Sequence, residues 1–170
     1  YLIEDVIAQN HTLVDSLTFN EGIVAKSALQ AISEVTDQAG PFAQLLGMKF
    51  ERMAGGRCTA SLQVKQHLLN PHGIAHGGVT FSLADSACGG AALSAVGEPR
   101  ILTQDMQIRY HGPARLGTIT ASAKVIHHGQ RTITVQGEVK QDTILIASVT
   151  ATFAILAPAN MAELERGAGG

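Results

Sequence analysis

The 170-residue sequence has no tryptophan, little excess charge of either sign and only two cysteines. Cys58 and Cys88 lack the spacing of a disulfide framework or of a CxxC redox or metal pair, which favours a reducing, cytoplasmic setting. The formal net charge of -2 provides no broad basic field. We therefore expect no nucleic-acid partner, although a small local phosphate site is compatible with this charge.

An apolar run free of charged residues and long enough to cross a membrane is also missing. The most apolar window, residues 77–96, contains Asp85, and a carboxylate at mid-span would be costly in lipid. This window predicts a buried helix, and we expect no membrane partner. With 45% hydrophobic and 15% charged residues, a chain of this length can bury one substantial core, so one domain is expected.

The first 41 residues predict a helical extension to that domain. Apolar residues recur at helical spacing over residues 21–35, and Gly40-Pro41 then breaks the pattern. The apolar residues within 42–48 predict a short turn that packs on the core. The expected boundaries are therefore 1–41 for the N-terminal helical extension, 42–157 for the main domain and 158–170 for a frayed tail.

The sequence of the main domain predicts strands both before and after one long helix. A hairpin is expected first, with strands at residues 49–53 and 57–64 joined through Gly55-Gly56. The next stretch, residues 67–78, is rich in His, Pro and Gly and predicts a loop that ends at a helix N-terminus. Period-two alternation predicts strands after the helix, and short turns at Gly112-Pro113 and residues 128–130 predict antiparallel neighbours. These strands are expected at 101–111, 117–127, 131–140 and 143–156.

This order of elements predicts an α+β fold. A single helix has to cover most of the apolar face of the sheet. It is rich in small residues, and Gly89 and Gly90 at mid-helix each cost about 1 kcal/mol relative to alanine. We expect close packing against a curved sheet to offset this cost. An antiparallel sheet wrapped around one long, small-residue helix is the hotdog fold.

A glycine-rich turn, His76-Gly77-Gly78, runs into the N-terminus of the long helix. The first N–H groups of a helix have no intrahelical acceptor, and the helix dipole makes them a site for an oxygen that develops negative charge. Glycine lets a carbonyl oxygen approach these groups closely. The turn therefore predicts an oxyanion hole, and a plain helix start with a tight turn is the structural alternative.

Asp85 is the second candidate group. A carboxylate among small and apolar residues is costly to bury unless it is paired or functional, whereas a polar stripe with Ser82 and Ser86 is the structural alternative. The eight residues from Gly77 to Asp85 advance about 12 Å along a helix, so one helix cannot apply both groups to one carbonyl. If both act, Asp85 comes from an antiparallel second copy of the helix. This requirement predicts a two-fold dimer with two composite sites.

Other catalytic arrangements have little support in the sequence. There is no GxSxG nucleophile elbow, and neither cysteine lies in a catalytic motif. His67, His72 and His76 share one loop, but no Cys or carboxylate stands at the spacing that a zinc site requires. The sequence therefore predicts no metal site, and nothing in it calls for a cofactor.

The segment Asn70-x-x-Gly73-x-x-His76-Gly77-Gly78, followed by Leu83-Ala84-Asp85-Ser86-Ala87, resembles the signature of the PaaI-like hotdog thioesterases. The resemblance covers roughly residues 42–156. This family contains phenylacetate-pathway thioesterases and mammalian acyl-CoA thioesterase 13. It implies a hotdog fold and hydrolysis of acyl-CoA thioesters.

The resemblance also implies roles for single residues. Asp85 is implied as nucleophile or as general base acting through water, and the Gly77 N–H as oxyanion donor. Asn70 and His76 are implied to orient the water, the thioester or the loop, and Thr103 to help position the nucleophilic water. Further residues are expected to contact the substrate. Gly73 and Gly78 are expected to contact it from the loop, and His128 and Arg131 are expected to lie near a CoA phosphate. Solvated surface charge is the alternative for His128 and Arg131, and also for the neighbouring or similar residues His127, Arg100, Arg109 and Arg115.

The resulting prediction is hydrolysis of an aryl-CoA or a medium- to long-chain acyl-CoA to the free acid and CoA. The expected assembly is a homodimer with composite sites that pairs further into a tetramer. Two alternatives stay open: a hotdog hydratase or dehydratase, and a hotdog module that binds acyl-CoA or assembles without turnover. The first is disfavoured because no suitably placed histidine shares the helix of Asp85, and the second because both Gly77 and Asp85 are present.

Overall fold

The structure is a computed structural model that describes residues 40–97 and 101–157. The predicted helix at 21–35, the frayed tail and Arg100 lie outside these ranges. Six strands and one long helix are found where the sequence pattern predicts them, with ends that differ by at most one residue. The elements are α3 (Gly40–Leu46), β1 (Met48–Ala54), β2 (Arg57–Val64), η1 (Gln66–Leu68), α4 (Gly77–Val96), β3 (Ile101–Tyr110), β4 (Gly117–His128), β5 (Thr132–Gln141) and β6 (Ile144–Ile155).

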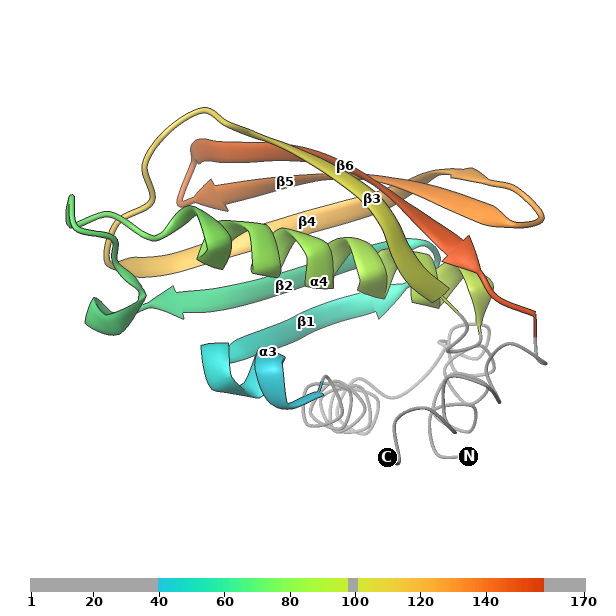
Figure 1. The fold of residues 1–170 in the computed structure, drawn as a ribbon, viewed down its shortest axis with the longest axis horizontal. Coiled ribbons are helices and arrows are strands. Elements are labelled where there is room, and N and C mark those ends of the chain that lie inside the picture. Colours follow the sequence, from blue (N-terminus) through green and yellow to red (C-terminus); the bar gives the residue numbers. More distant parts are fainter. Residues whose placement is uncertain (1–39, 98–100, 158–170) are drawn as a thin grey trace, which may run out of the picture.

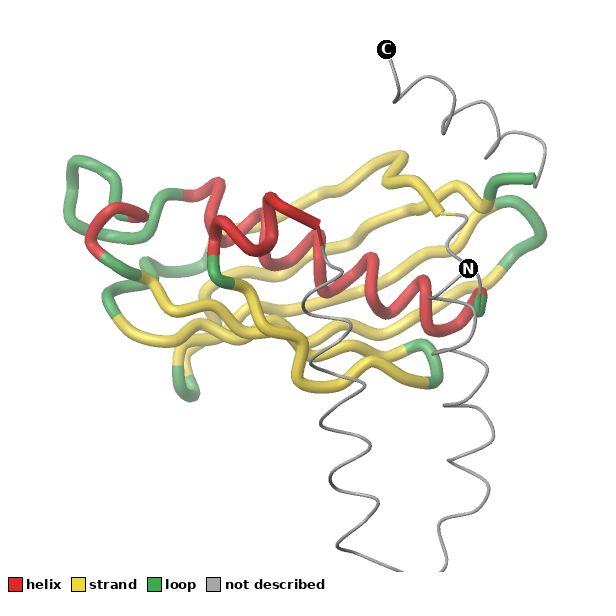
Figure 2. The backbone as a smooth tube through the Cα atoms, turned by 90° about the horizontal axis from the view of Figure 1, so that it is seen from below, coloured by secondary structure: helices red, strands yellow, loops and turns green. Residues whose placement is uncertain are grey.

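The six strands form one antiparallel sheet in the order β1-β2-β4-β5-β6-β3. The sheet curves around α4, and the two edge strands β1 and β3 lie on either side of the helix (Figure 1). Seen after a quarter turn, α4 runs along a single face of the sheet (Figure 2). Every strand contacts the helix. This is the α+β hotdog arrangement.

One predicted pairing is wrong. The Gly112-Pro113 turn does not join neighbouring strands, because β3 pairs with β6 at the sheet edge while β4 pairs with β2 and β5. The connection instead passes the start of α4, where the Ala75 N–H donates to the Ala114 carbonyl oxygen at 2.8 Å. A short turn signal shows where a chain reverses, but the closure of the sheet around a helix decides which strand becomes the neighbour.

The inner surface of the sheet forms the core with α4. The predicted alternation in β4 and β5 is confirmed, because Ile119, Ala121, Ile133 and Val135 are all fully buried. Close packing against the helix glycines is confirmed at Gly90, where an added Cβ would lie 2.7 Å from the Cys58 sulfur. The cost of glycine inside the helix is thus offset by contact between the helix backbone and the sheet.

The N-terminal part of the described chain differs from its prediction. Gly40 and Pro41 begin α3, and the apolar residues that follow up to Leu46 belong to this short helix and not to a turn, whereas Met48 begins β1. A positive φ of +84° at Gly40 suits glycine, and proline is favoured at the first position of a helix. The predicted boundary after residue 41 therefore falls inside α3. Within α3, Ala43 is buried, whereas Phe42 and Leu45 are exposed.

In the described ranges, α4 is the one helix whose length and composition would suffice to cross a membrane. Half of its most apolar window is buried inside the fold. The apolar residues of α4 therefore serve the protein core, as expected from the position of Asp85 within it.

Candidate active site

The loop before α4 is held by Asn70 and Gly73. The Asn70 side-chain oxygen accepts hydrogen bonds from the backbone N–H groups of His72 (2.9 Å) and Ile74 (3.4 Å). The Asn70 N–H donates to the Ile74 carbonyl at 2.8 Å, and Gly73 has a φ of +73° that other residues rarely adopt. Of the roles implied for Asn70, the shaping of the loop is thus visible in its own hydrogen bonds.

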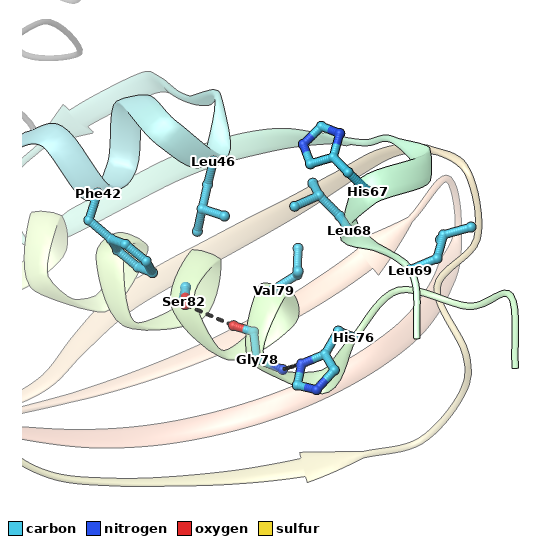
Figure 3. Close-up of a pocket in the computed structure, with 9 residues that line it drawn as sticks. All are labelled: Phe42, Leu46, His67, Leu68, Leu69, His76, Gly78, Val79 and Ser82. Carbon is cyan, nitrogen blue, oxygen red and sulfur yellow. Dashed lines mark hydrogen bonds between the residues drawn. The ribbon is translucent and has the colours of Figure 1, made fainter. Parts of the chain in front are cut away.

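His76 caps α4. Its Nδ1 accepts a hydrogen bond from the Gly78 N–H at 3.0 Å, as Figure 3 shows, while the Gly77 N–H has no acceptor among the described residues. A Cβ at residue 78 would lie 3.1 Å from this Nδ1, so glycine leaves room for the cap. The helix start therefore offers one free backbone donor, at Gly77, beside one that is already occupied.

Tyr110 also contacts this helix start, which the sequence did not reveal. Its hydroxyl donates to the Gly77 carbonyl oxygen at 2.8 Å from the last residue of β3. Nothing in the local sequence predicts this contact, because Tyr110 is 33 residues away and β3 was expected beside β4. A tyrosine at the end of a strand is ordinarily read as a surface residue.

Asp85 lies half-buried on the outer side of α4. The Thr103 hydroxyl of β3 donates to its Oδ1 at 3.2 Å. Burial raises the pKa of Asp85, and the hydrogen bond from Thr103 lowers it in part. The carboxylate is thus a stronger base than a free aspartate and is oriented by one hydroxyl.

The two cysteines are unsuited to nucleophilic attack. Cys58 and Cys88 are both buried in the core, and burial raises the pKa of each thiol to about 12. A thiol with such a pKa stays protonated near neutral pH, whereas the thiolate is the reactive form. Among the described residues, no three His, Cys, Asp or Glu side chains are close enough together to hold a metal ion.

Two clefts flank the start of α4. One, of about 410 Å³, lies between α3, η1 and α4, and its wall is largely apolar with Phe42, Leu46 and Val79 beside Ser82 (Figure 3). The other, of about 570 Å³, lies on the side of Gly77 and Tyr110. Neither cleft includes Asp85. Within one protomer, the free Gly77 N–H and the Asp85 carboxylate therefore do not line a common cleft.

The predicted phosphate contacts lie far from Gly77 in the same protomer. His128 and Arg131 are exposed at the β4–β5 turn, at the end of the sheet opposite to the start of α4 (Figure 1). His127 lies at the same turn, whereas Arg109 and Arg115 lie toward the other end. The structure thus brings together Thr103 with Asp85, and Asn70 and His76 with the loop, but not Arg131 with Gly77.

The sequence matches the model of the Thioesterase superfamily over residues 72–147, a span that includes Gly77, Asp85 and Thr103. It is 35% identical over 95 residues to the acyl-coenzyme A thioesterase PaaI of Escherichia coli, covering 53% of this chain and 64% of that protein. It is 26% identical over 150 residues to the medium/long-chain acyl-CoA thioesterase YigI of Salmonella typhimurium, covering 78% of this chain and 97% of that protein.

The fold also matches solved structures. A mutant of the phenylacetic acid degradation protein PaaI from Thermus thermophilus superposes with a TM-score of 0.65 at 30% identity. That match covers 69% of this chain and all of the other chain. The chain therefore belongs to the PaaI-like hotdog thioesterases and is an enzyme that hydrolyses acyl-CoA thioesters.

Proposed function

We propose that Asp85 activates the water that attacks the thioester carbonyl, while the Gly77 N–H of a second subunit stabilises the oxyanion. The observation that carries this proposal is that each of the two groups is available for its role. Asp85 is half-buried and held by Thr103, and the Gly77 N–H is a free donor at the start of the same helix. A basic carboxylate and an unoccupied donor are the parts that hydrolysis of an activated carbonyl requires.

The reaction consumes one water molecule. The water oxygen bonds to the thioester carbon as Asp85 takes a proton, and negative charge develops on the carbonyl oxygen facing Gly77. The carbon–sulfur bond then breaks, CoA leaves as a thiolate that takes up a proton, and the free acid remains. Direct attack by the carboxylate is the second route, through a mixed anhydride that water then opens.

Both groups can act on one substrate only across a subunit boundary. Gly77 and Asp85 lie eight residues apart on α4, about 12 Å along the helix axis. In a two-fold dimer with antiparallel copies of α4, Asp85 of each subunit faces Gly77 of the other. The exposed edge of β3 is a second surface for this contact, because an unpaired edge strand is ordinarily covered. Pairing of two such dimers into a tetramer leaves the composite sites unchanged.

The proposed antiparallel dimer also accounts for the expected role of the other candidate residues. His128 and Arg131 lie at the end of the sheet remote from Gly77, so in the second subunit they come to the same end as Gly77. There they can meet the phosphates of CoA. The apolar cleft lined by Phe42, Leu46 and Val79 extends along α4 as far as Ser82, about one helical turn before Asp85, and fits an aryl or medium-length acyl group.

Hydrolysis of a panel of aryl-CoA and acyl-CoA substrates by wild type and Asp85→Asn tests the chemistry. We expect kcat to fall at least a hundredfold in the variant while acyl-CoA binding is retained. Ser86→Ala, on the adjacent helix position, is the control and keeps its activity. Full turnover by Asp85→Asn would overturn the assignment.

Subunit mixing tests the composite site. Asp85→Asn and Gly77→Pro, which lacks the N–H, are each expected to be inactive, but a heterodimer of the two restores one complete site. Random exchange of equal amounts then recovers about a quarter of wild-type activity, because half of the dimers are mixed and each holds one intact site of two. Recovery of no activity after verified exchange would show that each subunit carries its own complete site.

A further inference from the structure

The peptide group that joins Gly77 to Gly78 is held at both ends. Its carbonyl oxygen accepts a hydrogen bond from the Tyr110 hydroxyl at 2.8 Å, and its N–H donates to His76 Nδ1 at 3.0 Å. Two side chains, one from the N-cap of α4 and one from the end of β3, therefore fix the plane of one peptide. This plane follows directly on Gly77, whose own N–H is free.

These two hydrogen bonds, which together act as a clamp on the peptide, are needed because of the two glycines in this segment. Two consecutive glycines have a wider choice of backbone angles than any other pair, and the first turn of a helix frays readily. An oxyanion donor stabilises a transition state well only if it is already oriented before the reaction begins. Gly77 therefore needs external contacts to hold its N–H in one direction.

Tyr110 reaches Gly77 because β3 contains a bulge. Residues 103 and 110 are seven apart, and in a regular strand an odd separation places two side chains on opposite faces. The register of β3 against β6 shifts between Thr103 and Asp105, so that Thr103 pairs with Phe153 and Tyr110 with Ala147. Both partners are buried on the face that packs against α4. The extra residue thus turns Thr103 and Tyr110 to the same side.

One strand consequently contacts α4 at both candidate catalytic positions, Gly77 and Asp85. Thr103 donates to the Asp85 carboxylate near the start of β3, and Tyr110 donates to the Gly77 carbonyl at its end. The strand and the helix run in opposite directions, so the order of the two contacts along β3 is the reverse of their order along α4. The bulge serves the active site because it makes these two contacts compatible.

The contact of Tyr110 with Gly77 orients the helix start and contributes little to core packing. The side chain is 51% exposed, so little of its ring contributes to the apolar core. An added Cβ at Gly77 would lie 3.4 Å from the Tyr110 oxygen, which places the hydroxyl directly against this glycine. The 570 Å³ cleft beside the two residues leaves room for a substrate group.

We propose that Tyr110 is a positioning residue for the thioesterase reaction, which fixes the Gly77–Gly78 peptide so that the Gly77 N–H faces the oxyanion. This inference rests on the proposed function, in which Gly77 is the donor. Tyr110 does not touch the reacting atoms and acts through the peptide. Partial burial raises the pKa of Tyr110, so its hydroxyl stays protonated and able to donate throughout the neutral range.

Tyr110→Phe removes the hydroxyl and keeps the ring. We expect kcat to fall about five- to tenfold, the effect of losing one neutral hydrogen bond, with KM and the melting temperature unchanged. Thr150→Val is the matched control, because it removes an exposed hydroxyl from the outer face of β6. Wild-type kcat in Tyr110→Phe overturns the proposal, and so does a loss that appears in KM or in the melting temperature alone.

A double-mutant cycle with His76→Ala tests the clamp itself. If both side chains hold one peptide, release of either end loosens it, and the double variant loses less activity than the product of the two single losses. Multiplicative losses would overturn the clamp. Asp85→Asn separates this inference from the proposed function: if that variant is inactive and Tyr110→Phe is fully active, the positioning role fails alone. If Asp85→Asn is fully active, the proposed function itself fails.

Discussion

The inner and outer faces of α4 differ in both composition and contacts. The inner face is closed against the sheet, where Leu83, Ala87, Cys88 and Ala91 are at most 1% exposed. On the outer face, Ser82 and Asp85 remain partly accessible and Phe81 is 38% exposed. The helix thus combines a face without functional polar groups and a face that carries them.

This difference shows how one helix can serve both folding and catalysis. Small residues let the sheet approach the inner face, which stabilises the fold through packing. The outer face is left free for a carboxylate whose burial is only partial, and a second subunit can complete its surroundings. Substitutions on the two faces should therefore affect different measurements.

The largest effect is expected at the start of the outer face, where Gly77→Pro and Gly77→Ala form a matched pair. Both add a Cβ, but only proline removes the N–H, and proline is well tolerated at the first position of a helix. The preceding residue, His76, has φ -57° and ψ 137°, which suits a residue before proline. We expect kcat of Gly77→Pro to be about 10²–10³ lower than that of Gly77→Ala. Equal rates would exclude the Gly77 N–H as the oxyanion donor.

The next effect concerns stability and separates the two faces directly. A Cβ at Gly90 would meet the Cys58 sulfur at 2.7 Å, whereas a Cβ at Gly89 meets only Phe153 at 3.7 Å. We expect Gly90→Ala to lower the free energy of unfolding by about 1–3 kcal/mol. Gly89→Ala should leave it unchanged or raise it by up to about 1 kcal/mol through helix propensity. Chemical denaturation of both variants checks this, and equal destabilisation would contradict the packing difference.

A smaller effect is expected from the hydroxyl that orients Asp85. Thr103→Val removes the hydrogen bond that lowers the pKa of Asp85, so that pKa rises further. Because the basic form is lost as pH falls through this pKa, the acid limb of the kcat/KM profile moves to higher pH. We expect the plateau to fall about three- to tenfold. Thr103→Ser keeps the hydroxyl and should retain the wild-type profile; an unshifted limb in Thr103→Val would count against the contact.

The smallest effect is a gain in stability on loss of the carboxylate. Burial raises the pKa of Asp85 in the folded state above its unfolded value near 3.8. The stabilising contribution of protonated Asp85 is therefore fully present below the unfolded pKa and is lost as pH rises through the folded pKa. Asp85→Asn should consequently melt about 2 °C higher than wild type at pH 7, with the gain vanishing at low pH. A lower melting temperature at neutral pH would mean that the charge stabilises the fold.

Much of the architecture could be predicted because it depends on local patterns. The alternation of Ile119 to Ala123 and of Ile133 to Val139 has the period of a half-buried strand, and the small-residue run of α4 has the length of a helix. The position of β3 could not be predicted in this way. Its neighbour is decided by contacts between distant segments, and the Gly112-Pro113 turn carries no information about them.

The residues of the candidate site also differ in whether local sequence could predict them. Gly77, Asp85 and His76 could be singled out because their types and spacing on one segment have chemical meaning. Tyr110 could not, since its contact with Gly77 depends on the bulge in β3 and on the placement of this strand at the edge beside β6. A bulge changes the face to which a side chain points without leaving a clear mark in the sequence.

The sequence by itself determined the periodic strands, the small-residue helix and the two groups that its N-terminal half carries, because these follow from residue type and local spacing. Only the tertiary structure decided that β3 lies at the sheet edge and that its Thr103 and Tyr110 meet the two ends of the candidate site. The physical reason is that these contacts join residues 18 and 33 positions apart, and their geometry depends on how the whole sheet closes around α4.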